Sequence, residues 1–235
     1  MARSIPPDRF RRLVEISTRI FVERGYRPTQ MADVADALGV AKGTLYGYVE
    51  SKEALFDAAV RFADDLDAAP DASALPLPTP PAGATVAYVR ARLTAEAQEL
   101  ALVGSLGARA APRDGAAELE RVLRDLYRRM HRNRRALKLV DRCALDHPEL
   151  GAVWFEEGRW GQVALLGAFL ERRIAAGRLR AVPSVPIAAR AVLETLATWA
   201  IHMPWDPSPR PFAEPDAEQA VVDLLVHAFA KERRR

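Results

Sequence analysis

The stretch GVAKGTLYGYVESKEAL, residues 39–55, decides the fold of this chain. Gly43 and Gly47 lie four residues apart in what reads as one short helix, although each glycine inside a helix costs about 1 kcal/mol relative to alanine. Residues four apart share a helical face. A face without side chains allows close approach to a large surface, such as a DNA groove or another helix.

The residues around this stretch predict a helix-turn-helix. Apolar residues recur at helical spacing over residues 9–24, which Gly25 ends, and again over residues 30–38, which Gly39 ends. A three-residue bend leads into a third helix over residues 42–49. Ser51 is then the predicted N-cap of a fourth helix over residues 51–68. Two short helices joined by a tight glycine turn are typical of DNA-binding heads.

The third helix has an apolar side and a polar side. Leu45 and Val49 are four residues apart and predict the buried side, whereas a second set is expected to face outward and can donate hydrogen bonds: Lys42, Thr44, Tyr46 and Tyr48. Half-buried packing with the hydroxyl in water is the alternative for the tyrosines. Residues 1–52 hold nine Lys or Arg and six Asp or Glu, a small basic excess that suits phosphate contact without proving it.

At this point the sequence resembles the TetR family of transcriptional regulators, from Phe10 to about Phe56. The resemblance lies in FVERGY at residues 21–26, ALGV at residues 37–40, KGTLY at residues 42–46 and SKE at residues 51–53. It implies that the third helix enters the major groove of operator DNA. By position it implies seven DNA-contacting residues: Thr29, Gln30, Lys42, Thr44, Tyr46, Tyr48 and Lys52.

Two positions depart from the family pattern. Ala41 stands where the family usually has Ser or Thr, so the third helix lacks a side-chain cap, at a typical cost of about 1 kcal/mol. Val49 stands where the family usually has Phe, which thins the packing beneath the helix.

The rest of the chain predicts an all-α fold, because helical patterns recur and strand-favouring runs are nearly absent. Residues 1–50 are interpreted as the DNA-binding domain. Residues 51–235 are interpreted as a helical effector-binding and dimerisation domain, with a connecting helix at 51–68 and a proline-rich loop at 70–83. Further helices are expected at residues 84–103, 115–131, 134–146, 148–176, 184–203 and 215–231.

The resemblance implies a homodimer that responds to a small molecule of unknown identity. The segments at 148–176 and 184–203 are long and apolar and could form a four-helix bundle across a two-fold axis, or could be interior helices of a monomer. Six aromatic residues are candidate walls of an effector pocket, with ordinary core packing as the alternative for each: Tyr88, Tyr127, Trp154, Phe155, Trp160 and Trp199.

A row of arginines follows one face of the helix expected at residues 115–131 and continues beyond it: Arg121, Arg124, Arg128, Arg132 and Arg135. Such a row is usually a solvated face. The alternative hypothesis is that it faces the DNA-binding head or flanking phosphates.

Other classes of function have little support. The four histidines lack metal-ligand spacing, and neither a nucleophile elbow nor a phosphate-binding glycine loop is found, so we expect no enzyme, no catalytic site, no metal and no cofactor. An architectural DNA-binding protein is expected to carry a higher positive net charge than the +3 of this chain. The lone Cys143 and the lack of an export or membrane-spanning run predict a cytosolic protein without membrane contact. Cys143 itself is expected to be a small buried residue.

Overall fold

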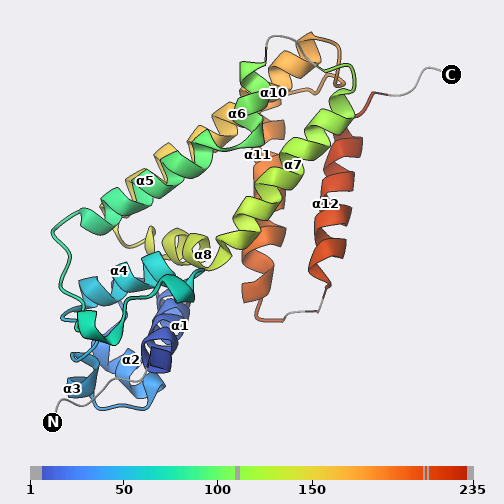
Figure 1. The fold of residues 1–235 in the computed structure, drawn as a ribbon. Coiled ribbons are helices and arrows are strands. Elements are labelled where there is room, and N and C mark those ends of the chain that lie inside the picture. The colour runs from blue at the N-terminus through green and yellow to red at the C-terminus, as the bar shows by residue number, and fades with distance from the viewer. Residues whose placement is uncertain (1–6, 109–111, 209, 211, 232–235) are drawn as a thin grey trace. The chain divides into compact units, whose positions relative to one another are not determined.

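The chain is all helical in the computed structural model, which describes residues 7–108, 112–208, 210 and 212–231 (Figure 1). No strand occurs among these residues, and one isolated bridge joins Val49 and Leu77. The all-α expectation is therefore confirmed. The α-helices run in this order: α1 Pro7–Arg24, α2 Met31–Leu38, α3 Lys42–Leu45, α4 Lys52–Phe62, α5 Ala84–Gln98, α6 Ala101–Gly107, α7 Gly115–Arg132, α8 Arg134–Cys143, α9 Pro148–Gly151, α10 Gly161–Ala175, α11 Val185–Ala197 and α12 Glu214–Phe229.

The described residues also form five helical segments that are wound more tightly or more widely than an α-helix. Three are 3₁₀ turns and two are π-helical: the 3₁₀ turns η1 Leu66–Ala68, η2 Ala72–Ala74 and η5 Met203–Trp205, and the π-helices η3 Ala152–Trp160 and η4 Thr198–His202. The expected helix at 148–176 is thus interrupted by a π-helical stretch, and the one at 184–203 ends in such a stretch.

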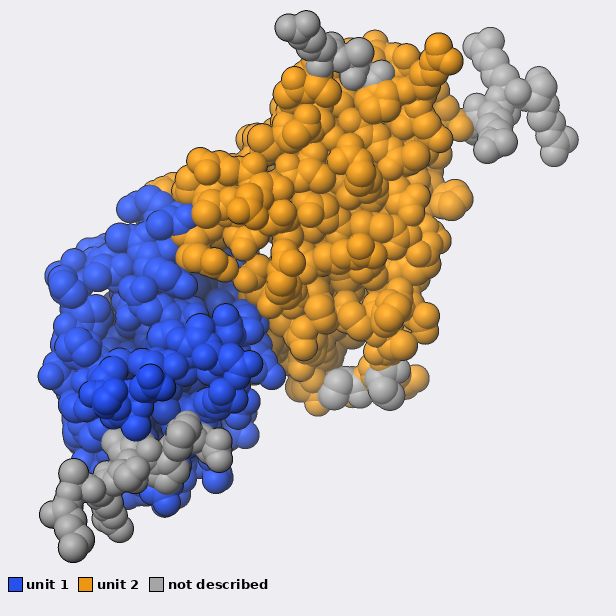
Figure 2. All heavy atoms as spheres, in the orientation of Figure 1, with its two compact units in different colours: residues 1–91, 135–155 blue, residues 92–134, 156–235 orange. Residues whose placement is uncertain are grey.

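The chain divides into two compact units, coloured separately in Figure 2. Unit 1 holds residues 1–91 and 135–155, and unit 2 holds residues 92–134 and 156–235. Unit 1 therefore combines the helix-turn-helix region with α8 and α9, which come from the second half of the sequence. The functional boundary expected at residue 50 is a different division and stays a prediction.

In unit 1, α1 packs against α2 and α4, and α2 packs against α3. Both predicted glycine stops are confirmed: Gly25 has a φ of 96° and Gly39 has a φ of 73°, values that favour glycine. Ser51 caps α4 as predicted, because its hydroxyl accepts a hydrogen bond from the Ala54 N–H at 3.1 Å. Glycine stops and an N-cap, which are local sequence signals, therefore predict these helix ends of unit 1 correctly.

Unit 2 is built on α7, α10, α11 and α12. Helix α10 packs along α11, and α7 packs against α11 and α12. The apolar face of α7 is buried, and it consists of Leu119, Val122, Leu123, Leu126 and Met130.

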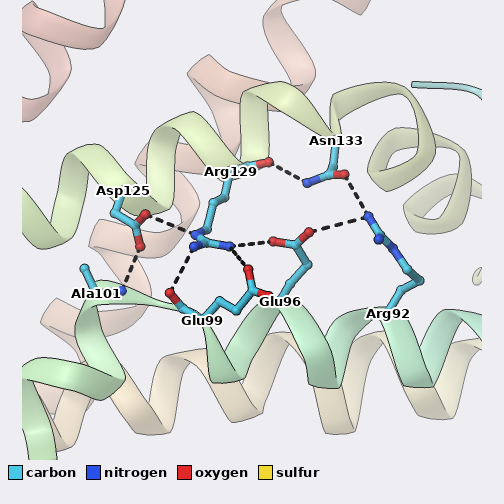
Figure 3. Close-up of polar contacts among 7 residues, drawn as sticks. All are labelled: Arg92, Glu96, Glu99, Ala101, Asp125, Arg129 and Asn133. Atoms are coloured by element: carbon cyan, nitrogen blue, oxygen red, sulfur yellow. Dashed lines mark hydrogen bonds and ion pairs between the residues drawn. The ribbon is translucent and has the colours of Figure 1, made fainter. Parts of the chain in front are cut away.

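The helix expected over residues 84–103 is broken between α5 and α6. Side chains of α7 satisfy the backbone groups at the break (Figure 3): the Asp125 carboxylate accepts from the Ala101 N–H at 2.8 Å, and the Arg129 guanidinium donates to the Glu99 carbonyl at 2.9 Å. The break is therefore a product of tertiary contacts, which helical periodicity does not report.

Candidate nucleic-acid interface

The third helix is shorter than expected. α3 spans four residues, and the chain then turns, so the expected helix over residues 42–49 is confirmed only in its first half. The Thr44 N–H donates to the Ala41 carbonyl at 2.8 Å, and the Gly47 N–H donates to the Thr44 carbonyl at 3.0 Å. Ala41 provides no side-chain cap, as expected.

One edge of α3 is open to solvent. The side chains of Lys42 and Thr44 are exposed, and that of Tyr46 is 42% exposed. Among the described residues, these three side chains make no hydrogen bond or ion pair. Their donors are therefore available to an external partner.

Gly43 lies on this open edge. A Cβ built at Gly43 meets no atom within 4 Å, so nothing inside the described chain requires a glycine there. At Gly47 a Cβ would come within 3.2 Å of the Thr44 carbonyl oxygen. Gly47 is therefore explained by a contact within the chain, whereas Gly43 is not. Only Gly43 fits a helix face that lacks side chains so that an external surface can approach it.

The opposite edge of α3 is buried as predicted. Leu45 and Val49 are both fully buried. Tyr48 corrects the expectation, because it is only 2% exposed and belongs to the core of unit 1. The helical face that was expected to carry Tyr46 and Tyr48 together ends when α3 ends, and the following turn directs Tyr48 inward.

Thr29 is a second correction. Its side chain is fully buried, and its hydroxyl donates to the Gly25 carbonyl at 2.7 Å, which closes the turn between α1 and α2. Gln30 is exposed at the start of α2, where its N–H donates to the Asp33 carboxylate at 2.8 Å. The Asp33 carboxylate also pairs with Arg24 at 2.6 Å, and these contacts lower its pKa.

Lys52 is only half exposed. Its ammonium lies 4.6 Å from the centre of the Tyr26 ring and donates to the Arg27 carbonyl at 3.1 Å. Burial lowers the pKa of Lys52. Burial together with the nearby carboxylate of Glu53 raises the pKa of Tyr26 to about 12. Lys52 therefore braces the α1–α2 turn, and its proposed phosphate contact stays a prediction.

Residues beyond the recognisable motif hold the same turn. The Asp146 carboxylate accepts from the N–H groups of Tyr26 and Arg27, both at 3.1 Å, and Arg142 donates to the Arg24 carbonyl at 2.6 Å. A Cβ at Gly25 would lie 2.5 Å from the Asp146 carboxylate. Sequence reasoning missed Asp146, because no local pattern links residues 120 positions apart.

The aromatic candidates for an effector pocket are divided between the units. Tyr88 lies beneath the Arg61 guanidinium at 4.1 Å in unit 1, and Trp154 donates to Asp141 at 2.7 Å there. Phe155 also belongs to unit 1, whereas Tyr127 is fully buried in unit 2. A shared pocket lined by these four stays a prediction.

Four arginines of the predicted row have partners within the folded units, and the fifth, Arg132, is exposed. Arg124 and Arg128 pair with Glu218 of α12 at 3.0 and 2.9 Å, and Arg121 donates to the Ser105 hydroxyl at 3.0 Å. Arg135, in unit 1, donates its N–H to Asp64 at 2.9 Å. In unit 2 these contacts brace α7 against α6 and α12.

A second network in unit 2 joins the end of α5 to α7 (Figure 3). Arg129 is its centre: the guanidinium contacts Glu96 at 2.9 Å, Asp125 at 3.0 Å and Glu99 at 3.3 Å. Arg92 donates to Asn133 at 3.4 Å. Charged side chains of α7 thus serve the internal structure of this unit.

Cys143 lies where the sequence predicts it, in the core. Cys143 is fully buried, and its burial raises the pKa of the thiol, which keeps it protonated and inert. In the part of the chain that the structure describes, no group of three or more metal-binding side chains gathers. No helix among the described residues combines the length and hydropathy needed to cross a bilayer.

Comparison with known proteins identifies the N-terminal region. Residues 13–59 match the family model described as bacterial regulatory proteins, tetR family. The HTH-type transcriptional repressor KstR2 of Rhodococcus jostii (strain RHA1) is 46% identical over 55 residues, which are 23% of this chain and 27% of that protein. The matched stretch thus spans about a quarter of the length of such curated relatives.

Solved structures resemble the whole fold. The ketosteroid transcriptional regulator KstR2 of Mycobacterium tuberculosis has a TM-score of 0.59 at 17% identity, covering 99% of this chain and 100% of that one. AibR in complex with isovaleryl coenzyme A and operator DNA has a TM-score of 0.51 at 16% identity, covering 93% and 98%. At these identities the likeness shows a shared fold.

Proposed function

We propose that this chain, whose N-terminal domain belongs to the TetR family, is a ligand-responsive DNA-binding regulator of transcription. In this proposal it acts as a homodimer on a palindromic operator, most simply as a repressor that a small molecule releases. Residues 1–50 would carry the DNA-binding function, and residues 51–235 would carry effector binding and dimerisation.

The open edge of α3 carries the proposal. Lys42, Thr44 and Tyr46 present donors that no described residue uses, and Gly43 leaves the backbone accessible between them. Lysine and hydroxyl side chains donate to phosphate oxygens and to base edges in the major groove. A solvated helix of no function has no need of a glycine at position 43, since alanine would fit the space and favour the helix.

The geometry of DNA supports the proposed dimer. One short helix grips weakly, and two-fold operators present two half-sites, about 34–36 Å apart when they occupy successive major grooves. α10 and α11 are the proposed dimer helices, and α10 carries the small residues Gly161, Ala164 and Ala168. Bound near a promoter, such a dimer would block polymerase.

A small molecule can release the proposed dimer from DNA only if it binds the DNA-free conformation more tightly than the DNA-bound conformation. AibR was solved with isovaleryl coenzyme A, and KstR2 is named for ketosteroids. Acyl-coenzyme A thioesters and steroids are therefore the first compounds to test against this chain. The buried Tyr127 and the partly buried Tyr88, Trp154 and Phe155 stay candidate contacts.

The test is a footprint of the purified chain on the DNA that flanks its own gene. We expect a short palindromic protection, which the double variant Lys42→Ala, Tyr46→Ala loses. Tyr48 is left unchanged, because its burial makes Tyr48→Ala a core substitution.

The control is Arg19→Ala, which removes one positive charge from the exposed face of α1 instead of α3. It should keep the footprint. Diffuse protection that ignores the α3 substitutions would favour an architectural DNA-binding protein. Compounds that erase the footprint of the unmodified chain would identify the effector class.

A further inference from the structure

The proline-rich segment folds back onto the end of the third helix. The Leu77 N–H donates to the Tyr48 carbonyl at 2.8 Å, and the Glu50 N–H donates to the Leu77 carbonyl at 3.0 Å. These two bonds flank a parallel bridge between Val49 and Leu77. We name residues 76–81 the strap. It is part of unit 1, although its composition indicates a linker.

The strap also reaches the start of α4. The Thr79 N–H donates to the Glu50 carboxylate at 2.9 Å, and the Thr79 hydroxyl donates to the Ser51 hydroxyl at 2.9 Å. Ser51 in turn caps α4 by accepting from the Ala54 N–H. Four consecutive residues, 48–51, thus receive support from two residues of the strap.

The spacing of the prolines suits this contact. Residues 76–81 read PLPTPP, so only Leu77 and Thr79 carry N–H groups, and both donate to residues 48–50. Proline restricts φ, which lowers the conformational entropy lost when a segment becomes ordered. The strap is therefore suited to dock in one register.

Helix α3 is too short to be stable without support from neighbouring residues. α3 has only four residues, whereas isolated helices shorter than about 12–15 residues are marginal in water. It lacks a side-chain cap at Ala41, and Gly43 lowers the stability of the helix further. Its angle therefore depends on its packing against α2 and on the residues that follow it, which the strap holds.

We propose that the strap is a positioning element of the DNA-binding head, and that Leu77 and Thr79 hold α3 at the angle needed to recognise a specific DNA sequence. This inference rests on the proposed function. It extends the reading head beyond the matched residues 13–59, because two of its positioning residues lie about twenty positions further along the chain.

The experiment compares Leu77→Pro, which removes the N–H donor, with Leu77→Val, which keeps it. Thr79→Val, which removes the hydroxyl, is compared with Thr79→Ser, which keeps it. For each full-length variant we would measure affinity for the operator and for a scrambled duplex of equal length, together with amide exchange at residues 44–50.

We expect Leu77→Pro to weaken operator binding by about tenfold or more while scrambled-duplex binding changes less than about twofold. Thr79→Val should cause a smaller loss of operator affinity. The control variants Leu77→Val and Thr79→Ser should each retain the operator affinity of the unmodified chain. Amide exchange at Gly47, Tyr48 and Glu50 should accelerate in Leu77→Pro. A support that merely stabilised the fold would weaken binding to both duplexes alike.

Unchanged operator affinity in Leu77→Pro, or an equal loss on both duplexes, would overturn the inference. If the unmodified chain protects no DNA at all, the proposed function fails instead. In that case amide exchange alone tests whether the strap positions α3. Unaltered amide exchange at residues 44–50 in Leu77→Pro would overturn this inference as well.

Discussion

Polar side chains are used differently in the two units. In unit 2, Arg173 is fully buried and donates to the Glu118 carboxylate at 2.5 and 2.7 Å and to the Ser105 carbonyl at 2.8 Å. In unit 1, Lys42 and Tyr46 on α3 face solvent, and no described residue engages them. The Arg173 guanidinium is therefore hydrogen-bonded inside the fold, whereas the donors of Lys42 and Tyr46 remain available to a partner.

The difference shows that a row of arginines need not be available to an external partner. The arginines of α7 outnumber the cations of α3, yet Arg124, Arg128 and Arg129 all have carboxylate partners in unit 2. A phosphate must compete with those carboxylates, whereas at α3 it competes only with water. Available donors, and not total charge, are therefore the basis on which we propose α3 as the interface.

The largest expected effect tests the internal use of charge. Glu118→Ala leaves the buried Arg173 without its counter-ion, which should lower the free energy of unfolding by about 3–5 kcal/mol. Urea denaturation measures it. The control is Glu120→Ala on the same helix, whose carboxylate is 43% exposed and pairs with Arg124 at 2.8 Å, and which should cost about 0–1 kcal/mol. Similar losses in both variants would contradict the comparison.

Acid should weaken the same ion pair. Burial raises the pKa of Glu118, but hydrogen bonds and charge from Arg173 outweigh it, so the pKa is lower in the folded chain than in the unfolded one. The stabilisation is present above the unfolded pKa, about 4.3, and is lost as pH falls through the folded value. Urea midpoints between pH 6 and pH 3 measure this. Glu118→Gln should flatten the part of the pH dependence that this carboxyl contributes; an unchanged slope would contradict the assignment.

Gly43→Ala should separate stability from binding. Alanine fits the open space and favours the helix, so the free energy of unfolding should stay level or rise by up to about 1 kcal/mol. Operator affinity should fall, because the added methyl group stands where DNA approaches the backbone. Thermal unfolding and operator titration measure the two effects.

The matched control is Gly25→Ala, where alanine meets Asp146 and a φ of 96°. That variant should lose stability. Gly43→Ala with undiminished operator affinity would show that DNA does not approach this edge.

The smallest effect concerns the arginine row. Arg128 is 65% exposed and pairs with Glu218 at 2.9 Å, so Arg128→Ala should change the free energy of unfolding by less than about 1 kcal/mol. Operator affinity and its salt dependence should stay unchanged. A lower salt slope in operator titrations would instead assign Arg128 to a phosphate.

Local signals account for most of the helix starts and stops. Gly25, Gly39 and Ser51 act where they were expected, because a positive φ and an N-cap depend on neighbours a few residues away. The buried face of α7 follows from a period of 3.6 residues alone. The exposed side chains Lys42, Thr44 and Tyr46 were predicted for the same reason.

The errors share a different cause. Tyr48 was expected on the surface because α3 was read as continuing to residue 49, whereas the chain turns after Leu45 and buries the ring. Thr29 was expected to contact DNA, but its hydroxyl donates to the Gly25 carbonyl and closes the α1–α2 turn. In both cases the side chain is buried, which neither the periodic pattern nor the resemblance indicated.

Local patterns in the sequence predict the helical class, the helix-turn-helix and the residues on the open edge of α3, because glycine stops, caps and amphipathic spacing act over a few residues. The fold was needed to show that Asp146 binds the α1–α2 turn, that the strap holds residues 48–51, and that Arg173 pairs with Glu118. Those contacts join residues from about 27 to 120 positions apart. Their partners are chosen by packing and by the need to satisfy buried polar groups, which no local pattern encodes.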